Sequence, residues 1–339
     1  MKACYNLLLI QQPFSFKVRS IVSWRCSMNA YHAAHNGAIL VDLNASGRIE
    51  LSDRDRLSLI HRMSTNDLKG LAQGAGAATV LTTPIGRIID LLTVFHDGEK
   101  AYAVTSPGRG EKILNYLQRN IFFNDRVKVA QMDHELWGLY GARAAKMLEN
   151  FGATNQGLYE FAKYEEVLIA RVKPLAGGGF WLMGAPDVLE KLTRQLIAWG
   201  AAEADAATVE LLRIEAGYPG VETELTEDYI PLEVGLWDCV SFNKGCYTGQ
   251  EIIARMESRG KLAKMMVRLS LNEELSGKVP LYLDGTVVGT LTSIARQPSG
   301  SFLALGFVKP AAVSDNAVLT SENDVQLKIL GIAGAQPGR

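Results

Sequence analysis

The chain has 339 residues, of which 47% are hydrophobic and 21% charged, and its formal net charge is −1. This composition is typical of a globular protein with a sizeable core and two or three domains. The near-neutral charge argues against a general nucleic-acid or anionic-membrane binder, and no apolar run reaches the roughly 18 residues of a membrane span.

The first 34 residues differ in composition from the rest. Basic residues occur there without any acidic residue before Asp42, as in an organelle transit peptide. The alternative is a mis-assigned start, with Met28 as the initiator. We expect residues 1–34 to be a disordered extension in either case. The expected compartment is the bacterial cytoplasm, or the mitochondrial matrix if residues 1–34 are a transit peptide.

Residues 35–260 alternate predicted strands and helices. Strands are predicted at 79–83, 87–95, 101–105, 126–131, 167–172 and 180–183, and helices at 52–63, 110–119 and 186–199. Two sheet-plus-helix units with mixed strands indicate an α+β fold rather than a doubly wound parallel sheet.

The pattern changes near residues 260–264. Short apolar runs follow at 265–269, 279–283, 287–292 and 303–308, with a hairpin signal at Asp284-Gly285. Regular short strands without helices predict a small β-barrel over residues 261–332.

One segment, Lys244-Gly-Cys-Tyr-Thr-Gly-Gln-Glu251, combines a thiol, a cation, a phenol and a carboxylate, and two glycines interrupt it. The glycines indicate a backbone that turns sharply or lies close to another group. A nearby cation lowers the pKa of a thiol, so Lys244 could activate Cys246. No histidine is near in sequence, which argues against a papain-like nucleophile. The alternative is a small buried thiol. The cysteines and histidines show no ligand spacing, so we predict no metal site.

Two carboxylates are further candidates. Glu215 lies at the end of a predicted helix, where the helix dipole disfavours a negative charge, and a carboxylate can accept two parallel N–H groups from a pterin or guanidinium edge. Its alternatives are a salt bridge with Arg213 or solvent exposure. Asp90 interrupts an apolar strand and must be paired, face a cavity or lie on a solvent face.

A basic cluster follows the cysteine segment, and its members are Arg255, Arg259, Lys261, Lys264 and Arg268. Such a cluster suits carboxylates, phosphates or RNA. The alternative is a solvated helix face.

The run from Val240 to Arg255, followed by Arg259-Gly260, closely resembles the signature of the YgfZ group of the YgfZ/GcvT folate-binding family. Looser matches occur at 64–67, 84–87, 213–219 and 231–233. The resemblance covers roughly residues 36–330. It implies a GcvT-like ring of two mixed sheet/helix (ferredoxin-like) units plus a C-terminal barrel, with tetrahydrofolate or a one-carbon derivative in a central channel.

The resemblance also implies a function. YgfZ-like proteins support iron–sulfur cluster assembly or repair, and thereby tRNA-modifying and other iron–sulfur enzymes. Client enzymes or assembly factors are then the expected partners, and a monomer is expected. Cys246 would be a redox or transfer thiol facing the channel, and Asp90 a second catalytic candidate. The expected folate-binding residues are Glu215 for the pterin, Lys244, Tyr247, Gln250 and Glu251 in the loop, and Arg255 and Arg259 for the glutamate tail.

Two alternatives stay open. The glycine-cleavage aminomethyltransferases (T-proteins) resemble the same span, but they typically carry two adjacent aspartates on the strand that reads Ile89-Asp90-Leu91 here, and this chain keeps one. They also have Gly-Arg-Glu in place of Gly249-Gln-Glu251. The chain could therefore be a folate-dependent one-carbon transferase, or a tRNA- or protein-binding module without folate.

Overall fold

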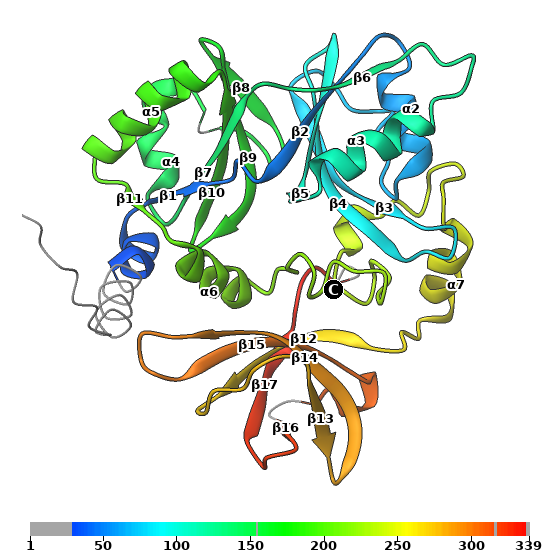
Figure 1. The fold of residues 1–339 in the computed structure, drawn as a ribbon, viewed down its shortest axis with the longest axis vertical. Helices are drawn as coiled ribbons and strands as arrows, with labels where there is room; N and C mark the ends of the chain where they lie inside the picture. The colour runs from blue at the N-terminus through cyan, green and yellow to red at the C-terminus, as the bar shows by residue number, and fades with distance from the viewer. Residues whose placement is uncertain (1–28, 154, 315–316, 337–339) are drawn as a thin grey trace, which may run out of the picture.

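The computed structural model describes residues 29–153, 155–314 and 317–336. Two sheet-and-helix units lie side by side, and a barrel lies below them across a layer of helix and loop (Figure 1). The predicted α+β class is confirmed. In the described residues, no helix is long and apolar enough to cross a membrane.

The first unit is a five-stranded antiparallel sheet in the order β3-β4-β5-β2-β6. Its strands are β2 (Ser46–Ser52), β3 (Ala75–Thr82), β4 (Ile88–His96), β5 (Lys100–Pro107) and β6 (Lys128–Gln131). Helices α2 (Arg56–Met63) and α3 (Gly110–Arg119) pack on one face of it. Leu59, Ile113 and Leu117 are fully buried there, because helical spacing places them on one side of each helix.

The second unit is a six-stranded sheet in the order β11-β1-β7-β10-β9-β8, with only β1 and β11 parallel among its described pairs. Its strands are β1 (Ile39–Asp42), β7 (Glu135–Tyr140), β8 (Phe161–Tyr164), β9 (Val167–Leu175), β10 (Gly178–Gly184) and β11 (Ala202–Glu203). The helices α4 (Ala144–Met147), η1 (Glu149–Phe151) and α5 (Pro186–Ala198) cover its outer face. The inner faces of the two sheets share an apolar core that includes Phe95, Tyr102, Val104 and Tyr140.

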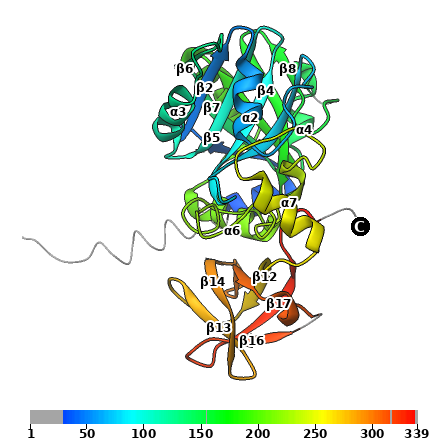
Figure 2. The same cartoon turned by 90° about the vertical axis from the view of Figure 1, so that its right-hand side faces the viewer.

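A connecting layer separates these sheets from the barrel (Figure 2). Helix α6 (Ala206–Ala216) begins at Asp205, whose carboxylate accepts a hydrogen bond from Thr208 N at 2.8 Å. It ends at Gly217, where φ is +72°, a conformation that glycine adopts without strain. The irregular chain that follows contains η2 (Trp237–Cys239) and leads into α7 (Gln250–Arg259).

The C-terminal strands form a closed barrel in the order β12-β15-β14-β13-β16-β17, as the fold prediction required. The strands are β12 (Met265–Leu271), β13 (Val279–Leu283), β14 (Thr286–Arg296), β15 (Phe302–Val308), β16 (Val318–Thr320) and β17 (Gln326–Ile332), with η3 (Pro310–Ala312) before β16. The apolar runs predicted only four of these strands. β16 has three residues, and β17 carries Lys328 in its middle, so neither shows a clear apolar run.

The fold begins earlier than expected. Residues 29–36 are helical, and Ala34 is fully buried in the core between the sheets. Residues 29–34 therefore do not belong to a disordered extension, because an apolar contact holds them. The prediction for residues 1–28 lies outside the described residues.

Candidate functional site

A pocket of about 490 Å³ opens where the inner faces of the two sheets meet α6. Strands β4 and β5 contribute Leu91, Thr93 and Val104–Pro107, and β9 and β10 contribute Val172, Lys173, Leu175 and Trp181. Helix α6 and its following loop close it with Val209, Glu210, Arg213 and Tyr218–Val221. Its size lies in the range of small-molecule sites, which are mostly apolar with a few placed polar groups.

Four aromatic side chains line this central pocket, namely Tyr140, Tyr159, Trp181 and Tyr218. Trp181 Nε1 donates a hydrogen bond to Tyr140 Oη at 2.8 Å, which fixes both rings. Burial raises the pKa of Tyr140 to about 12, so its phenol stays neutral. Fixed aromatic faces favour a flat heterocyclic ligand, because offset stacking supplements the burial of apolar area.

Asp90 lies beside the pocket but does not line it. Its side chain is 1% exposed, so its solvent-face alternative is wrong. Ser106 N donates to Asp90 Oδ2 at 3.2 Å, and Oδ1 has no hydrogen-bond partner. Because successive strand residues point to opposite faces, Leu91 and Thr93 line the pocket instead. A catalytic role for Asp90 stays a prediction.

The buried Asp90 carboxyl, with one oxygen lacking a hydrogen-bond partner, is expected to lower the stability of the fold in a pH-dependent way. Burial raises the pKa of its carboxyl. The folded state therefore holds this proton more tightly than the unfolded state, and stability falls as pH rises from the unfolded pKa to the folded one. Asp90→Asn should raise the free energy of unfolding by about 1 kcal/mol at pH 7 and lose this advantage below roughly pH 4. Urea unfolding of both proteins between these pH values measures the difference in the free energy of unfolding. An equal gain in stability at low and neutral pH would contradict a role for the Asp90 charge.

The loop from Lys244 to Gly249 lies apart from the central pocket. Cys246 is exposed, so the buried-thiol alternative is wrong for it, although it describes Cys239. No described residue beyond Leu236 lines the pocket. The thiol of Cys246 is therefore exposed and lies outside this pocket, and the expectation that it faces a folate channel stays a prediction.

Lys244 fixes this loop to the first unit. Its Nζ donates to the backbone oxygens of His61 at 2.5 Å, Ser64 at 2.8 Å and Asn66 at 2.7 Å, in and just after the C-terminal turn of α2. These bonds use all three ammonium donors. Burial lowers the pKa of Lys244 to about 8. Lys244 thus holds backbone rather than a ligand, and it cannot bind folate without breaking these contacts.

The other end of the loop is equally fixed. Tyr247 is buried with its ring 5.1 Å from Lys244 Nζ, and burial raises its pKa to about 12. Thr82 Oγ1 donates to the Thr248 carbonyl at 2.6 Å. Between these contacts, Gly245 and Cys246 are both exposed. The loop therefore exposes the Cys246 thiol, while contacts on both sides of it fix the backbone.

The remaining predicted binding residues lie on α7 or at the end of α6, and none of them lines the pocket. Gln250 and Glu251 begin α7, where Glu251 pairs with Arg255 at 2.7 Å on an exposed face, and Arg259 ends it. Glu215 lies 3.2 Å from His35 Nε2, and Arg213 pairs with Glu210 and Glu224, so the alternative of a salt bridge between Glu215 and Arg213 is wrong. The folate roles of these residues stay predictions without support from pocket geometry.

Sequence reasoning missed the residues that shape the pocket. Trp181 and Lys173 come from strands β10 and β9 of the second sheet, and Tyr159 comes from the turn before β8. Tyr218 lies within the matched run 213–219, but it was not predicted as a site residue. The available signal was the aromatic residues in these segments. Sequence spacing alone does not show that these residues meet in one pocket.

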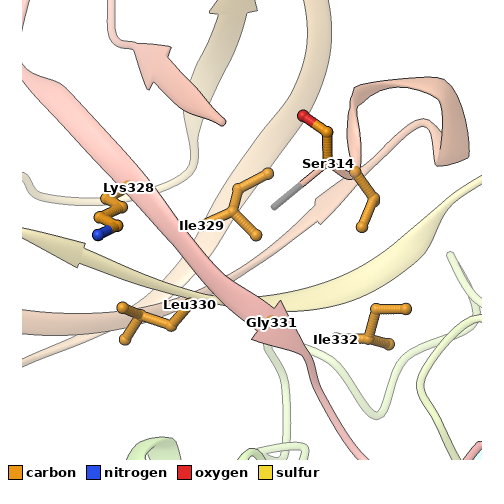
Figure 3. A pocket seen from close by; sticks show the side chains of 7 residues that line it. Ser314, Lys328, Ile329, Leu330, Gly331 and Ile332 are labelled. Atoms are coloured by element: carbon orange, nitrogen blue, oxygen red, sulfur yellow. The ribbon is translucent and has the colours of Figure 1, made fainter. Parts of the chain in front are cut away.

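The barrel has a wider hollow of about 750 Å³ along β17. Figure 3 shows Lys328, Leu330 and Ile332 on this strand, with Ser314 nearby. Among the described residues that line it, Lys328 is the one with a charged side chain. In the described residues, no cluster of three or more histidine, cysteine or carboxylate side chains could hold a metal ion.

Comparison with known proteins identifies the class. Residues 6–244 match the GCVT N-terminal domain, and the chain belongs to that family. A chloroplastic protein of Arabidopsis thaliana, named a putative transferase, is 29% identical over 87% of this chain and 71% of its own length. An aminomethyltransferase of Rubrobacter xylanophilus is 27% identical over 88% of this chain and 84% of its own.

A solved structure supports the fold. The glycine cleavage system aminomethyltransferase T of Bartonella henselae superposes with a TM-score of 0.81 over 89% of this chain and 88% of its own. Its sequence identity is 19%, so this likeness bears on the fold alone. The YgfZ-specific resemblance stays a prediction.

Proposed function

We propose that the central pocket binds a reduced folate, either tetrahydrofolate or a one-carbon derivative. The observation that carries this proposal is a pocket of about 490 Å³ with four aromatic walls in a GCVT-family fold. A pterin is a flat heterocycle, and such walls can stack on it. The names of the aminomethyltransferase relatives support a ligand of this class.

We further propose that folate binding serves an accessory role for iron–sulfur enzymes. T-proteins typically have two adjacent aspartates on this strand, whereas this chain keeps only Asp90, and Leu91 rather than Asp90 lines the pocket. The pocket wall therefore lacks a carboxylate there for proton handling. The exposed thiol of Cys246, outside the pocket, supports action on a separate partner.

Folate-dependent aminomethyl transfer is the second candidate. The names of the relatives favour it over the accessory role, because several are aminomethyltransferases. A rate assay for methylenetetrahydrofolate formation from an aminomethylated lipoyl carrier separates the two. Turnover at rates typical of enzymes, about 1 s⁻¹ or more, would establish the transferase and displace the accessory role.

Calorimetry with tetrahydrofolate tests the shared proposal. We expect saturable binding to the wild-type chain, and absence of binding at millimolar ligand would refute it. Tight, salt-dependent tRNA binding with no folate effect would instead favour a nucleic-acid module. The compartment stays a prediction. The candidates are the bacterial cytoplasm and the mitochondrial matrix, and the chloroplastic name of the Arabidopsis relative adds the plastid.

Cys246→Ala tests the accessory role. It should leave folate affinity within about twofold, because the thiol does not line the pocket, while failing to restore iron–sulfur enzyme activity in a deficient cell. Asn243→Ala, an exposed change in the same loop, is the matched control and should complement fully. Full complementation by Cys246→Ala would exclude the thiol from the function.

A further inference from the structure

The central pocket has two cationic lining residues, Lys173 and Arg213. A cation in an aromatic pocket can bind an anionic group of a ligand only if it has N–H donors to offer. Counting donors against their acceptors therefore distinguishes the two residues.

Arg213 has no donor left. Its Nε donates to Glu210, Nη1 to the Tyr218 carbonyl and Glu224, and Nη2 to Glu210 and Ser293 Oγ. These contacts take all five N–H groups of a guanidinium. Two carboxylates also neutralise its charge. Arg213 thus shapes the pocket but cannot bind an anion without breaking the structure.

Lys173 differs in each respect. Its Nζ lies 2.7 Å from Asp238 Oδ2, the one acceptor for it in the described part of the chain, whereas an ammonium has three donors. It also lies 5.7 Å from the centroid of the Tyr218 ring, which lines the same pocket. The Lys173 side chain is 24% exposed and that of Asp238 36% exposed. Asp238 can therefore turn to solvent when another anion takes its place.

We propose that Lys173 is the specificity-determining residue of the pocket and binds the carboxylate end of a ligand whose ring system stacks on the aromatic walls. This inference rests on the proposed folate function and assigns the glutamate carboxylates of the ligand to Lys173. It replaces the earlier assignment to Arg255 and Arg259, which lie on α7 outside the pocket. Asp238 acts as the internal competitor for Lys173, because the two side chains pair at 2.7 Å.

Because Asp238 and the ligand compete for Lys173, removing either side chain should change ligand affinity in opposite directions. Lys173→Met removes the cation, so affinity for 5-formyltetrahydrofolate should fall about tenfold. Asp238→Asn removes the competing carboxylate, so affinity should rise severalfold. A purely structural ion pair would weaken binding in both variants. Lys163→Met is the matched control. Lys163 lies on β8, the strand next to β9, pairs with Asp97 at 3.0 Å and does not line the pocket.

A second ligand isolates the charge. The dimethyl ester of 5-formyltetrahydrofolate keeps the rings but has no carboxylate, so Lys173→Met should leave its affinity within about twofold. Calorimetry on the full chain measures both ligands with all four proteins. Equal weakening of acid and ester by Lys173→Met, or weakening of the acid by Asp238→Asn, overturns the role of Lys173 while leaving folate binding intact. Failure of the wild-type chain to bind either ligand overturns the proposed function and this inference with it.

Discussion

Replacing Glu224 with alanine is expected to lower the free energy of unfolding by about 3–5 kcal/mol, because it leaves a buried guanidinium short of its charge partner. The Glu224 side chain is 0% exposed. It accepts hydrogen bonds from Gly220 N, Thr223 Oγ1 and Ser293 Oγ, each at 2.7 Å. Arg213 Nη1 lies 3.3 Å away.

These contacts join three parts of the protein. Arg213 belongs to α6, Gly220 and Thr223 to the connecting layer, and Ser293 to barrel strand β14. Glu224→Ala therefore also leaves buried donors unsatisfied between the layer and the barrel, which adds to the cost. The same change should disturb the pocket, since Arg213 lines it.

Urea unfolding of the purified variant measures this effect. Glu222→Ala is the matched control, because Glu222 is exposed two residues away and its loss should change stability by no more than about 0.5 kcal/mol. A loss below about 1 kcal/mol for Glu224→Ala would show that Arg213 finds other compensation.

Replacing Gly249 with alanine is expected to cost about 2–4 kcal/mol. The backbone of Gly249 has φ at +84°, which is strained for any residue with a Cβ. A Cβ there would lie 2.7 Å from the Thr83 carbonyl oxygen and 2.9 Å from Gly86 Cα. Both are backbone atoms of the β3–β4 turn, so the loop itself would have to move away.

Gly245→Ala is the control within the same loop. A Cβ at Gly245 meets nothing within 4 Å, and its φ is not in the left-handed region. We expect a change of no more than about 0.5 kcal/mol. Thermal or urea unfolding compares the pair, and similar losses in both would mean that loop flexibility, rather than contact with the β3–β4 turn, governs stability.

Local pattern was enough to predict the architecture. Helix α3 was predicted at its observed bounds, and α5 to within one residue, because their apolar spacing and end signals are strong. The barrel followed from short apolar runs and a hairpin signal. Even the loop of Cys246 was correctly expected to turn at glycine, since Gly249 has a positive φ.

The site could not be predicted as well, because its chemistry depends on partners far apart in the chain. Lys244 was expected to activate a thiol or bind folate, yet its acceptors are carbonyls about 180 residues away in sequence. A salt bridge between Arg213 and Glu215 was an alternative suggested by proximity in sequence, but Arg213 pairs with Glu210 and Glu224. Sequence spacing does not show which donors are already used.

The sequence by itself determined the α+β class, the barrel, the turn at the cysteine loop and the family resemblance, because these follow from periodicity, glycine and local motif. Only the tertiary structure decided that Cys246 is exposed outside this pocket, that Leu91 rather than Asp90 lines the pocket, and that Lys173 keeps free donors there. The physical reason is that burial and hydrogen-bond saturation arise when two sheets and α6 meet, and these set the availability of each polar group.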